Sequence, residues 1–317
     1  MTAPVPKVGL DKLNQTTGLD LTTYTGSLPM PHSKILEYVN NGYDALFVTL
    51  IDKIDRKILE TGKENGLKVV SSMSVGFNHI DTDVAKELGI KVGNTPGVLT
   101  ESVADTVMLL ILSGCRRAYE AIEAVRNGEW GVWKAEWMCG IDLNHATVGI
   151  IGLGRIGLAV AKRLKAFDCR IMYSDIQVNK EAEKLEAEYT DLNNILEKAD
   201  IVVPLCPLTD ETKGMFNKKL FGKMKKNSVF VNCSRGEVVQ QDDLYEALKN
   251  NTIFGAALDV TVPEPLPTNH KLLDLKNCYI LPHIASATKS TRNAMAELAA
   301  DNLINAFKGK DMKTPVV

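Results

Sequence analysis

Residues 147–175 constrain the fold of this chain more than any other segment does. Val148–Ile151 is a short apolar run, which is typical of a buried parallel strand. It leads into the glycine turn Gly152-Leu153-Gly154-Arg155-Ile156-Gly157 and then into a segment of helical periodicity at 158–164. A second strand-like run at 170–174 ends at Asp175. The order strand, glycine turn, helix, strand and acid predicts a βαβ unit that binds a dinucleotide.

Each part of this motif has a physical reason. Gly152 permits the tight turn, Gly154 lets a pyrophosphate approach the backbone, and Gly157 allows the helix to pack closely against the strand. The helix start at Arg155 and Ile156 offers free N–H groups to the phosphates. A G-x-G-x-x-G pattern alone also occurs in ordinary glycine-rich turns. Here both flanking strands, the helix and the acid favour the dinucleotide site.

Asp175 is expected to accept hydrogen bonds from the adenosine ribose. Its carboxylate would repel a 2′-phosphate, and no Arg follows it in Ile176-Gln177-Val178. The sequence therefore favours NAD(H), with NADP(H) as the alternative cofactor.

Size and composition limit the classes of protein that the chain can belong to. A length of 317 residues suggests two domains, and 45% hydrophobic with 24% charged residues is usual for a globular protein. A net charge of −2 gives no reason to expect nucleic acid or a membrane as partner. The longest apolar run, near 107–112, is too short for a bilayer, and the N-terminus lacks a secretory signal pattern. The six cysteines are scattered without C-x-x-C, which indicates reduced thiols in a cytoplasmic protein and no metal site.

The regions on both sides of the motif alternate between strand and helix patterns, which predicts parallel α/β domains. Asn94–Gly97 is the expected domain boundary, followed by one long helix from Glu101 to about Asn127. Asp81 is the expected N-cap of a helix at 84–88. The remaining expected strands are 19–24, 45–50, 68–71, 90–92, 201–205, 228–232, 253–260 and 279–281, and the remaining expected helices lie at 11–15, 31–39, 56–60 and 288–308.

All three tryptophans of the chain, Trp130, Trp133 and Trp137, lie in one loop. Simple core packing is one interpretation. The other is a loop that anchors a partner subunit or lines a ligand pocket, because Trp is enriched among buried interface anchors.

Three ionisable residues fall at or just past the carboxyl ends of predicted strands: Arg235, Asp259 and His283. Ligands of open parallel sheets bind outside the carboxyl ends of the strands. Arg can bind a carboxylate through two hydrogen bonds, His can exchange a proton near neutral pH, and Glu264 can orient the His. Each residue alone has an ordinary structural explanation, but their shared position predicts a catalytic set of Arg235, Glu264 and His283.

At these residues the chain resembles the D-2-hydroxyacid dehydrogenase family over nearly its whole length. The motifs that carry the resemblance are the glycine turn 152–157, Asn232-Cys233-Ser234-Arg235-Gly236-Glu237-Val238-Val239, Leu258-Asp259-Val260 with Pro263-Glu264-Pro265, and Leu281-Pro282-His283-Ile284-Ala285. Within the family, Trp133-Lys134, Trp137-Met138-Cys139-Gly140 and Pro265-Leu266-Pro267-Thr268-Asn269-His270 look most like the glyoxylate and hydroxypyruvate reductases of animals.

The resemblance implies a Rossmann-type dinucleotide-binding domain at 98–283 and a flavodoxin-like substrate domain at 1–97 and 284–317. It implies that Arg235 binds the substrate carboxylate and carbonyl, and that His283, paired with Glu264, is the general acid. It further implies a homodimer built on the helix that starts near Glu101. The other implied residues are Val75, Gly76 and Leu50 for the substrate, Trp137 for the partner's active site, Asp259 for the nicotinamide carboxamide, and Cys206, Pro207, Thr212, Cys233 and Ser286 around the cofactor.

Two features depart from the family pattern. Relatives of the subgroup often use NADPH and carry an Arg soon after the second strand, where this chain has Asp175 without a close Arg. Relatives also begin with a full β-strand before the segment that matches Val5–Leu13. Met1-Thr2-Ala3-Pro4 is too short and too rich in proline for that strand, so either another segment fills its place or the sheet is weakened.

The sequence therefore predicts an oxidoreductase that reduces glyoxylate or hydroxypyruvate, a small 2-oxo acid, to the 2-hydroxy acid with NAD(P)H. The alternatives are a phosphoglycerate dehydrogenase-like enzyme, although the chain ends at Val317 without a regulatory domain, and an inactive homologue. Another is an NAD-sensing binding protein like the family's corepressors, which keep the same Arg, Glu and His. The tryptophan loop favours the reductases.

Overall fold

The computed structural model describes all residues from Met1 to Val317 and divides into two units. The smaller unit comprises Met1–Leu99 and Ala287–Val317, and the larger unit comprises Thr100–Ser286.

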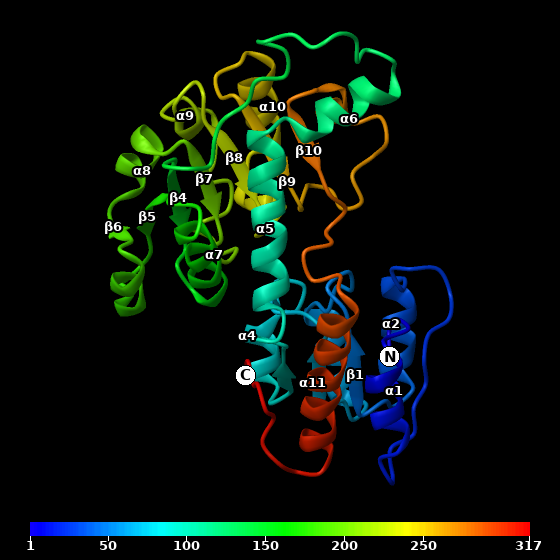
Figure 1. The fold of residues 1–317 in the computed structure, drawn as a ribbon. Coiled ribbons are helices and arrows are strands. Elements are labelled where there is room, and N and C mark those ends of the chain that lie inside the picture. The colour runs from blue at the N-terminus through cyan, green and yellow to red at the C-terminus, as the bar shows by residue number, and fades with distance from the viewer. The chain divides into compact units, whose positions relative to one another are not determined.

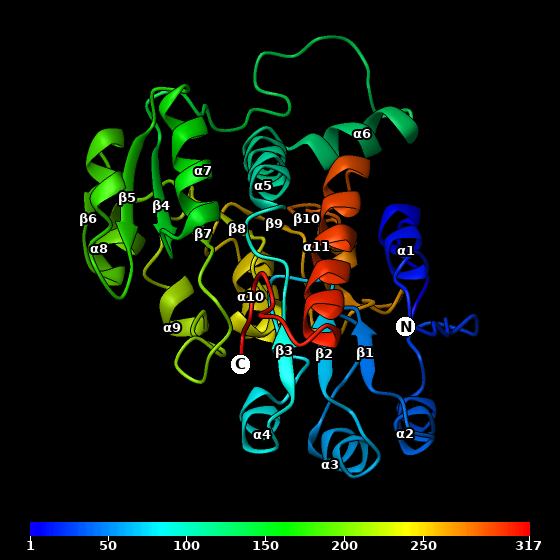
Figure 2. The ribbon, with the colours of Figure 1, turned by 90° about the horizontal axis from the view of Figure 1, so that it is seen from below.

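The smaller unit is built on a three-stranded parallel sheet of β1 (Ala45–Val48), β2 (Val69–Ser72) and β3 (Lys91–Gly93), in that order. Helices α2 (His32–Asn40), α3 (Arg56–Glu64) and α4 (Thr82–Glu87) cover one face, and α1 (Lys7–Asn14) and α11 (Lys289–Phe307) cover the other (Figure 2). The predicted cap of α4 is confirmed, because the Asp81 carboxylate accepts a hydrogen bond from the Val84 N–H.

The predicted strand at 19–24 is wrong, because no strand forms there. This segment instead bonds to the first residue: the Met1 amino group donates to the Thr22 carbonyl, and the Tyr24 N–H donates to the Met1 carbonyl. Thr2 then lies beside β1, where its N–H donates to the Phe47 carbonyl at 3.0 Å. Thr2 and Ala3 are both buried. The short N-terminal segment therefore lies along the free edge of β1. The sequence alone did not indicate which segment would take this place.

The larger unit is built on a seven-stranded parallel sheet with the order β10-β9-β8-β7-β4-β5-β6 (Figure 1). Helices α5 (Thr100–Cys115) and α7 (Arg155–Lys165) lie on one face, and α8, α9 and α10 lie on the other (Figure 2). Strands β4 and β7 are neighbours although β5 and β6 lie between them in the chain. From β4 the sheet therefore grows first towards β6 and then, from β7, towards β10 on the other side. The bounds are β4 Thr147–Ile151, β5 Arg170–Ser174, β6 Glu188–Tyr189, β7 Ile201–Pro204, β8 Val229–Asn232, β9 Gly255–Leu258, β10 Cys278–Ile280, α8 Leu192–Lys198, α9 Lys218–Phe221 and α10 Gln241–Lys249, with short 3₁₀ helices η1 Lys180–Leu185, η2 Gly236–Val238 and η3 Lys271–Asp274.

The single long helix expected from Glu101 to Asn127 is two helices, α5 and α6 (Ala118–Arg126). The chain turns at Arg117, whose φ of 53° lies in the left-handed region. The Cys115 carbonyl then accepts a hydrogen bond from the Ile141 N–H at 2.8 Å instead of continuing the helix. This break depends on a residue far along the chain, so helical periodicity alone does not predict it.

The parallel α/β architecture predicted for both parts is confirmed. No helix is both long and apolar enough to cross a membrane.

Candidate dinucleotide site and active site

The glycine turn after β4 combines two tightly packed glycines with open space in front of a helix start. Gly152 has a φ of +96°, and a Cβ there would lie 2.7 Å from the Cys206 nitrogen. A Cβ on Gly157 would lie 2.5 Å from the Gly152 carbonyl oxygen, so this position also requires glycine. Around Gly154, by contrast, a Cβ would meet nothing within 4 Å. Gly154 is the N-cap of α7 without a side-chain cap, which leaves open space in front of the N–H groups at the helix start, including those of Arg155 and Ile156.

Asp175 is held beside this turn at the end of β5. Its Oδ2 accepts a hydrogen bond from the Leu153 N–H at 2.7 Å, and its Oδ1 accepts one from the Ile176 N–H at 2.7 Å. The carboxylate therefore has a fixed place next to the glycine turn. Ile176, the residue that follows, is uncharged and 98% exposed.

The loop after β7 packs against the glycine turn, because the backbone of Cys206 lies directly beside Gly152. Cys206 is buried, and burial raises the pKa of its thiol to about 11, so the thiol is neutral. Thr212 closes the loop by donating its hydroxyl to the Pro207 carbonyl at 2.7 Å. Gly152 and Cys206 thus lie where the order of the sheet reverses, and open α/β sheets bind their ligands at this point.

Arg235 lies three residues beyond β8 in a loop that a buried amide holds. Asn232 is 1% exposed; its Oδ1 accepts from the Ser234 N–H and hydroxyl, and its Nδ2 donates to the Arg235 carbonyl at 3.0 Å. The Arg235 guanidinium donates to the Ser234 carbonyl and makes no ion pair. Burial lowers the pKa of Arg235, while the negative charges of Glu264 and Glu237 oppose this shift.

Glu264 and His283 are in direct contact. The His283 Nδ1 and the Glu264 Oε2 are 2.7 Å apart, and the Thr261 N–H donates to the Glu264 Oε1 at 3.0 Å. Burial by itself would raise the pKa of Glu264, but the His283 hydrogen bond and charge, with the Thr261 N–H and Arg235, lower it below its ordinary value of 4.5. Glu264 is therefore a carboxylate that fixes one ring nitrogen of His283 and leaves the other nitrogen for a ligand.

Asp259, directly after β9, holds the segment that carries His283. Its two carboxylate oxygens accept from the Ile284 and Ala285 N–H groups at 2.8 and 2.9 Å, and its carbonyl accepts from the His283 N–H. Burial raises the pKa of Asp259, and the two N–H donors oppose this rise. His283 has a φ of 52°, in the left-handed region that residues other than glycine rarely adopt. The hydrogen bonds that Asp259 accepts from the His283, Ile284 and Ala285 N–H groups hold this backbone in place.

The other predicted cofactor residues of this unit are Cys233 and Ser286, and both are buried. The Cys233 thiol contacts an Asp259 carboxylate oxygen at 3.9 Å, and burial raises the pKa of this thiol well above its ordinary value. Trp137 lies in the loop after α6 and is 39% exposed.

The smaller unit carries Val75, Gly76 and Leu50 at the carboxyl ends of β2 and β1. Asn94 donates to the Val75 carbonyl at 2.8 Å, and the Ser74 hydroxyl donates to the Gly76 carbonyl at 2.7 Å. Both carbonyls are therefore bound, while the two N–H groups make no hydrogen bond within the unit. Leu50 is half-buried in the turn after β1.

Sequence reasoning missed Asn232, Ser74 and Asn94, which hold the loops around the predicted residues. Asn232 stands within the motif that carried the resemblance, directly before the loop of Arg235, so its position was the available signal. Ser74 and Asn94 are far apart in sequence, and no local pattern relates them.

Comparisons with known proteins identify the family of the chain. Residues 108–285 match the family model described as D-isomer specific 2-hydroxyacid dehydrogenase, NAD binding domain. A glyoxylate reductase/hydroxypyruvate reductase of Homo sapiens is 47% identical over 98% of this chain and 95% of its own length. The chain belongs to the D-2-hydroxyacid dehydrogenases.

Relatives beyond animals and solved structures support the same family. A glyoxylate reductase of Thermofilum pendens is 43% identical over 98% of this chain and 91% of its own length. A crystal structure of a Thermus thermophilus protein has a TM-score of 0.92 and 40% identity, covering 100% of this chain and 98% of that one. An NADPH-dependent glyoxylate/hydroxypyruvate reductase of Sinorhizobium meliloti, solved with NADP and malonate, has a TM-score of 0.86 and 32% identity, covering 99% of this chain and 95% of that one.

Proposed function

We propose that this D-2-hydroxyacid dehydrogenase reduces glyoxylate and hydroxypyruvate to their 2-hydroxy acids with NADH. The larger unit would bind the dinucleotide, and the smaller unit would supply substrate contacts. The observation that carries the proposal is the His283–Glu264 pair, 2.7 Å apart, on the same sheet edge as the glycine turn. The names of relatives at 43–47% identity support the two substrates.

The residues at the glycine turn fit a dinucleotide. Gly152 and Gly157 exclude side chains by close contact, whereas the space in front of Gly154 is open to the pyrophosphate. Asp175, fixed by two N–H groups, would accept the adenosine ribose hydroxyls and would repel a 2′-phosphate. This arrangement supports NADH over NADPH.

The residues of the larger unit supply the polar chemistry that carbonyl reduction needs. The bound reduced nicotinamide supplies the hydride. Arg235, free of any ion pair, would bind the substrate's carboxylate and polarise its carbonyl oxygen. His283, with Nδ1 bonded to Glu264, would donate the Nε2 proton to the oxygen that becomes the hydroxyl. Glu264 stabilises the imidazolium before transfer and keeps the ring in one orientation.

The smaller unit would bind the substrate by its backbone. The free N–H groups of Val75 and Gly76 are suited to a carboxylate, because the bonds from Asn94 and Ser74 fix the peptide planes. Leu50 would limit the size of the group on the substrate's third carbon. A small 2-oxo acid satisfies both conditions.

A second copy of the chain is the proposed occupant of an exposed apolar surface on α6 and the loop after it. Trp133 is 85% exposed, Val132 81% and Trp130 69%, and Val125 of α6 is 56% exposed. So much exposed apolar area close together in sequence is typical of an interface. We expect a homodimer, with Trp137 reaching the active site of the partner subunit. A Trp130→Ser/Trp133→Ser variant should sediment as a monomer, whereas Ile176→Ser, which removes an apolar side chain elsewhere, should stay dimeric. A wild-type monomer contradicts this proposal.

The substrate proposal is tested by following reduced-nicotinamide absorbance with glyoxylate, hydroxypyruvate and 3-phosphohydroxypyruvate. The expected result is the highest kcat/KM for one of the first two. A clear preference for the phosphorylated acid would instead support a phosphoglycerate dehydrogenase-like enzyme. Tight NADH binding without turnover of any of the three would favour a nucleotide-sensing protein.

A further inference from the structure

A pocket of about 490 Å³ lies in the larger unit at the edge opposite the candidate active site. Phe254 directly precedes β9 and Asn277 directly precedes β10, so the pocket lies at the amino ends of these strands. The glycine turn, Arg235 and His283 all follow the carboxyl ends. The pocket is therefore separate from the dinucleotide site, and its volume lies within the usual range for small-molecule sites.

The rim of this pocket carries three cations without an acidic partner. Lys226, Lys249 and Lys276 line it, and none of them forms an ion pair. Lys249 contacts only the Tyr245 ring, with its Nζ 5.6 Å from the centroid. The one acid in the lining, Glu120, is bonded to Arg117 at 2.6 Å and is thereby neutralised. Three uncompensated ammonium groups around one cavity favour a ligand with several negative charges.

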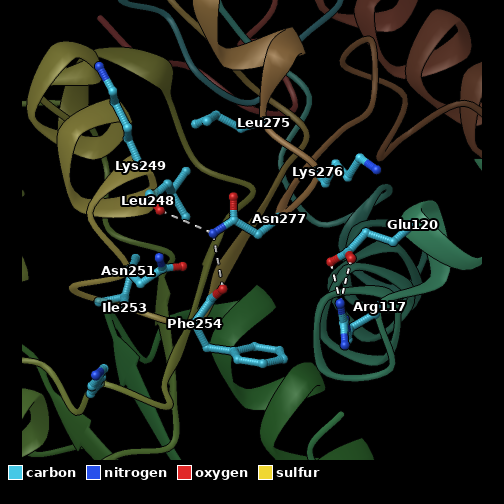
Figure 3. A pocket seen from close by; sticks show the side chains of 11 residues that line it. Arg117, Glu120, Leu248, Lys249, Asn251, Ile253, Phe254, Leu275, Lys276 and Asn277 are labelled. Carbon is cyan, nitrogen blue, oxygen red and sulfur yellow. Dashed lines mark hydrogen bonds and ion pairs between the residues drawn. The ribbon is translucent and has the colours of Figure 1, made fainter. Parts of the chain in front are cut away.

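The lining of the pocket is partly apolar and has one free acceptor. Of its apolar residues, Leu248 and Ile253 are buried in the core, whereas Phe254 and Leu275 keep part of their surface exposed. Asn277 donates its amide hydrogens to the Leu248 and Phe254 carbonyls at 3.3 and 3.2 Å, which leaves its Oδ1 without a partner. Figure 3 shows this oxygen on the side of Asn277 away from the two carbonyls, between Lys249 and Lys276, with the Phe254 ring below.

We propose that this basic pocket, lined by the residues just named, binds a nucleoside polyphosphate. The phosphates would contact Lys226, Lys249 and Lys276, because Lys is a frequent phosphate ligand. The flat base would lie against the partly exposed Phe254 ring and Leu275. This proposal goes beyond the dehydrogenase activity and does not depend on it.

The test is the binding of GTP to the full-length protein by isothermal titration calorimetry, with saturating NADH to fill the dinucleotide site. GTP should bind more tightly than inorganic tripolyphosphate, which lacks the base, and more tightly than guanosine, which lacks the charge. GTP that NADH displaces lies in the other site and contradicts the proposal. Tripolyphosphate that binds as tightly as GTP contradicts the role of the apolar lining.

Two variants locate the site. Lys226→Gln/Lys249→Gln/Lys276→Gln should weaken GTP binding roughly ten- to a hundredfold, the sum expected from three exposed ion pairs. The control Lys63→Gln/Lys86→Gln/Lys91→Gln makes the same change of net charge on exposed lysines of the smaller unit and should keep wild-type affinity. Equal weakening in both variants would show non-specific charge attraction and overturn the proposal. Both triple variants should keep the wild-type rate of hydroxypyruvate reduction, because none of these lysines lies at the glycine turn or near His283.

Phe254→Leu separates the base from the phosphates. This change keeps an apolar side chain but removes the ring, so GTP binding should weaken several-fold while tripolyphosphate binding stays unchanged. A loss of affinity for both, with an unfolding midpoint equal to that of the wild type, would contradict stacking on Phe254.

Discussion

The fixed carboxylate of Asp175 gives a quantitative prediction for cofactor preference. Two unit charges 4 Å apart interact with about 1 kcal/mol in water and about 4 kcal/mol near a protein surface. A 2′-phosphate carries about −1.5 to −2 charges, so its repulsion by Asp175 is expected to be about 3 kcal/mol. The carboxylate cannot turn away, because the Leu153 and Ile176 N–H groups hold both oxygens at 2.7 Å. The wild-type enzyme should therefore prefer NADH to NADPH about a hundredfold in kcat/KM.

The substitution Asp175→Ser removes the charge and shortens the side chain. Activity with NADPH should rise by the lost repulsion, and activity with NADH should fall about ten- to a hundredfold as charge-assisted bonds to the ribose disappear. The ratio of the two kcat/KM values should thus change by about 10³–10⁴. The assay is the initial rate of hydroxypyruvate reduction at varied NADH and NADPH.

A matched control removes a charge that is not at the ribose position. Glu183→Gln, in η1, neutralises an exposed carboxylate eight residues further along and should leave the cofactor ratio unchanged. The reasoning is refuted if Asp175→Ser leaves the ratio as in the wild type, or if Glu183→Gln shifts it equally.

Three further predictions concern the residues around the candidate active site. Arg235→Gln should lower kcat/KM for hydroxypyruvate at least about a hundredfold, because a bidentate charge-assisted contact is lost; an unchanged value, with NADH affinity also unchanged, removes Arg235 from the site. Asn232→Ala should lower the free energy of unfolding in urea by about 2–4 kcal/mol, since buried partners lose their bonds; Asn250→Ala, at an exposed helix end, is the control and should cost well under 1 kcal/mol. Glu264 has a lowered pKa in the folded state, so it contributes stability above pH 4.5 that is lost as pH falls through its folded value; urea unfolding from pH 7 to 3 should fall less steeply for Glu264→Gln than for the wild type, and parallel curves would contradict this.

The sequence predicted the elements whose signal is local. The glycine turn, the strands on both sides and the Asp81 cap depend on residues within a few positions of each other, and the structure has them where they were expected. The carboxyl ends of parallel strands share one edge, and this topology, together with the chemistry of the residue types and the family resemblance, predicted that Glu264 and His283 meet.

The features that sequence reasoning missed depend on distant partners. Residues 19–24 have the β-branched composition of a strand, yet their backbone bonds to Met1, and Thr2 pairs with β1 instead. The break between α5 and α6 involves a hydrogen bond from Ile141 to Cys115. The pocket at the amino ends of β9 and β10 gathers Lys226 and Lys276 from two loops and Lys249 from the end of α10, and no periodicity relates them.

The central claim is that His283, oriented by Glu264, is the proton donor in the reduction of a 2-oxo acid. The most direct measurement compares hydroxypyruvate-dependent NADH oxidation by the wild type and by His283→Gln, with NADH affinity measured by fluorescence in both. The account predicts turnover by the wild type, a loss of about 10²–10⁴-fold in kcat for the variant, and unchanged NADH affinity. A variant that keeps nearly full activity, or a wild type that binds NADH without turning over substrate, would contradict it.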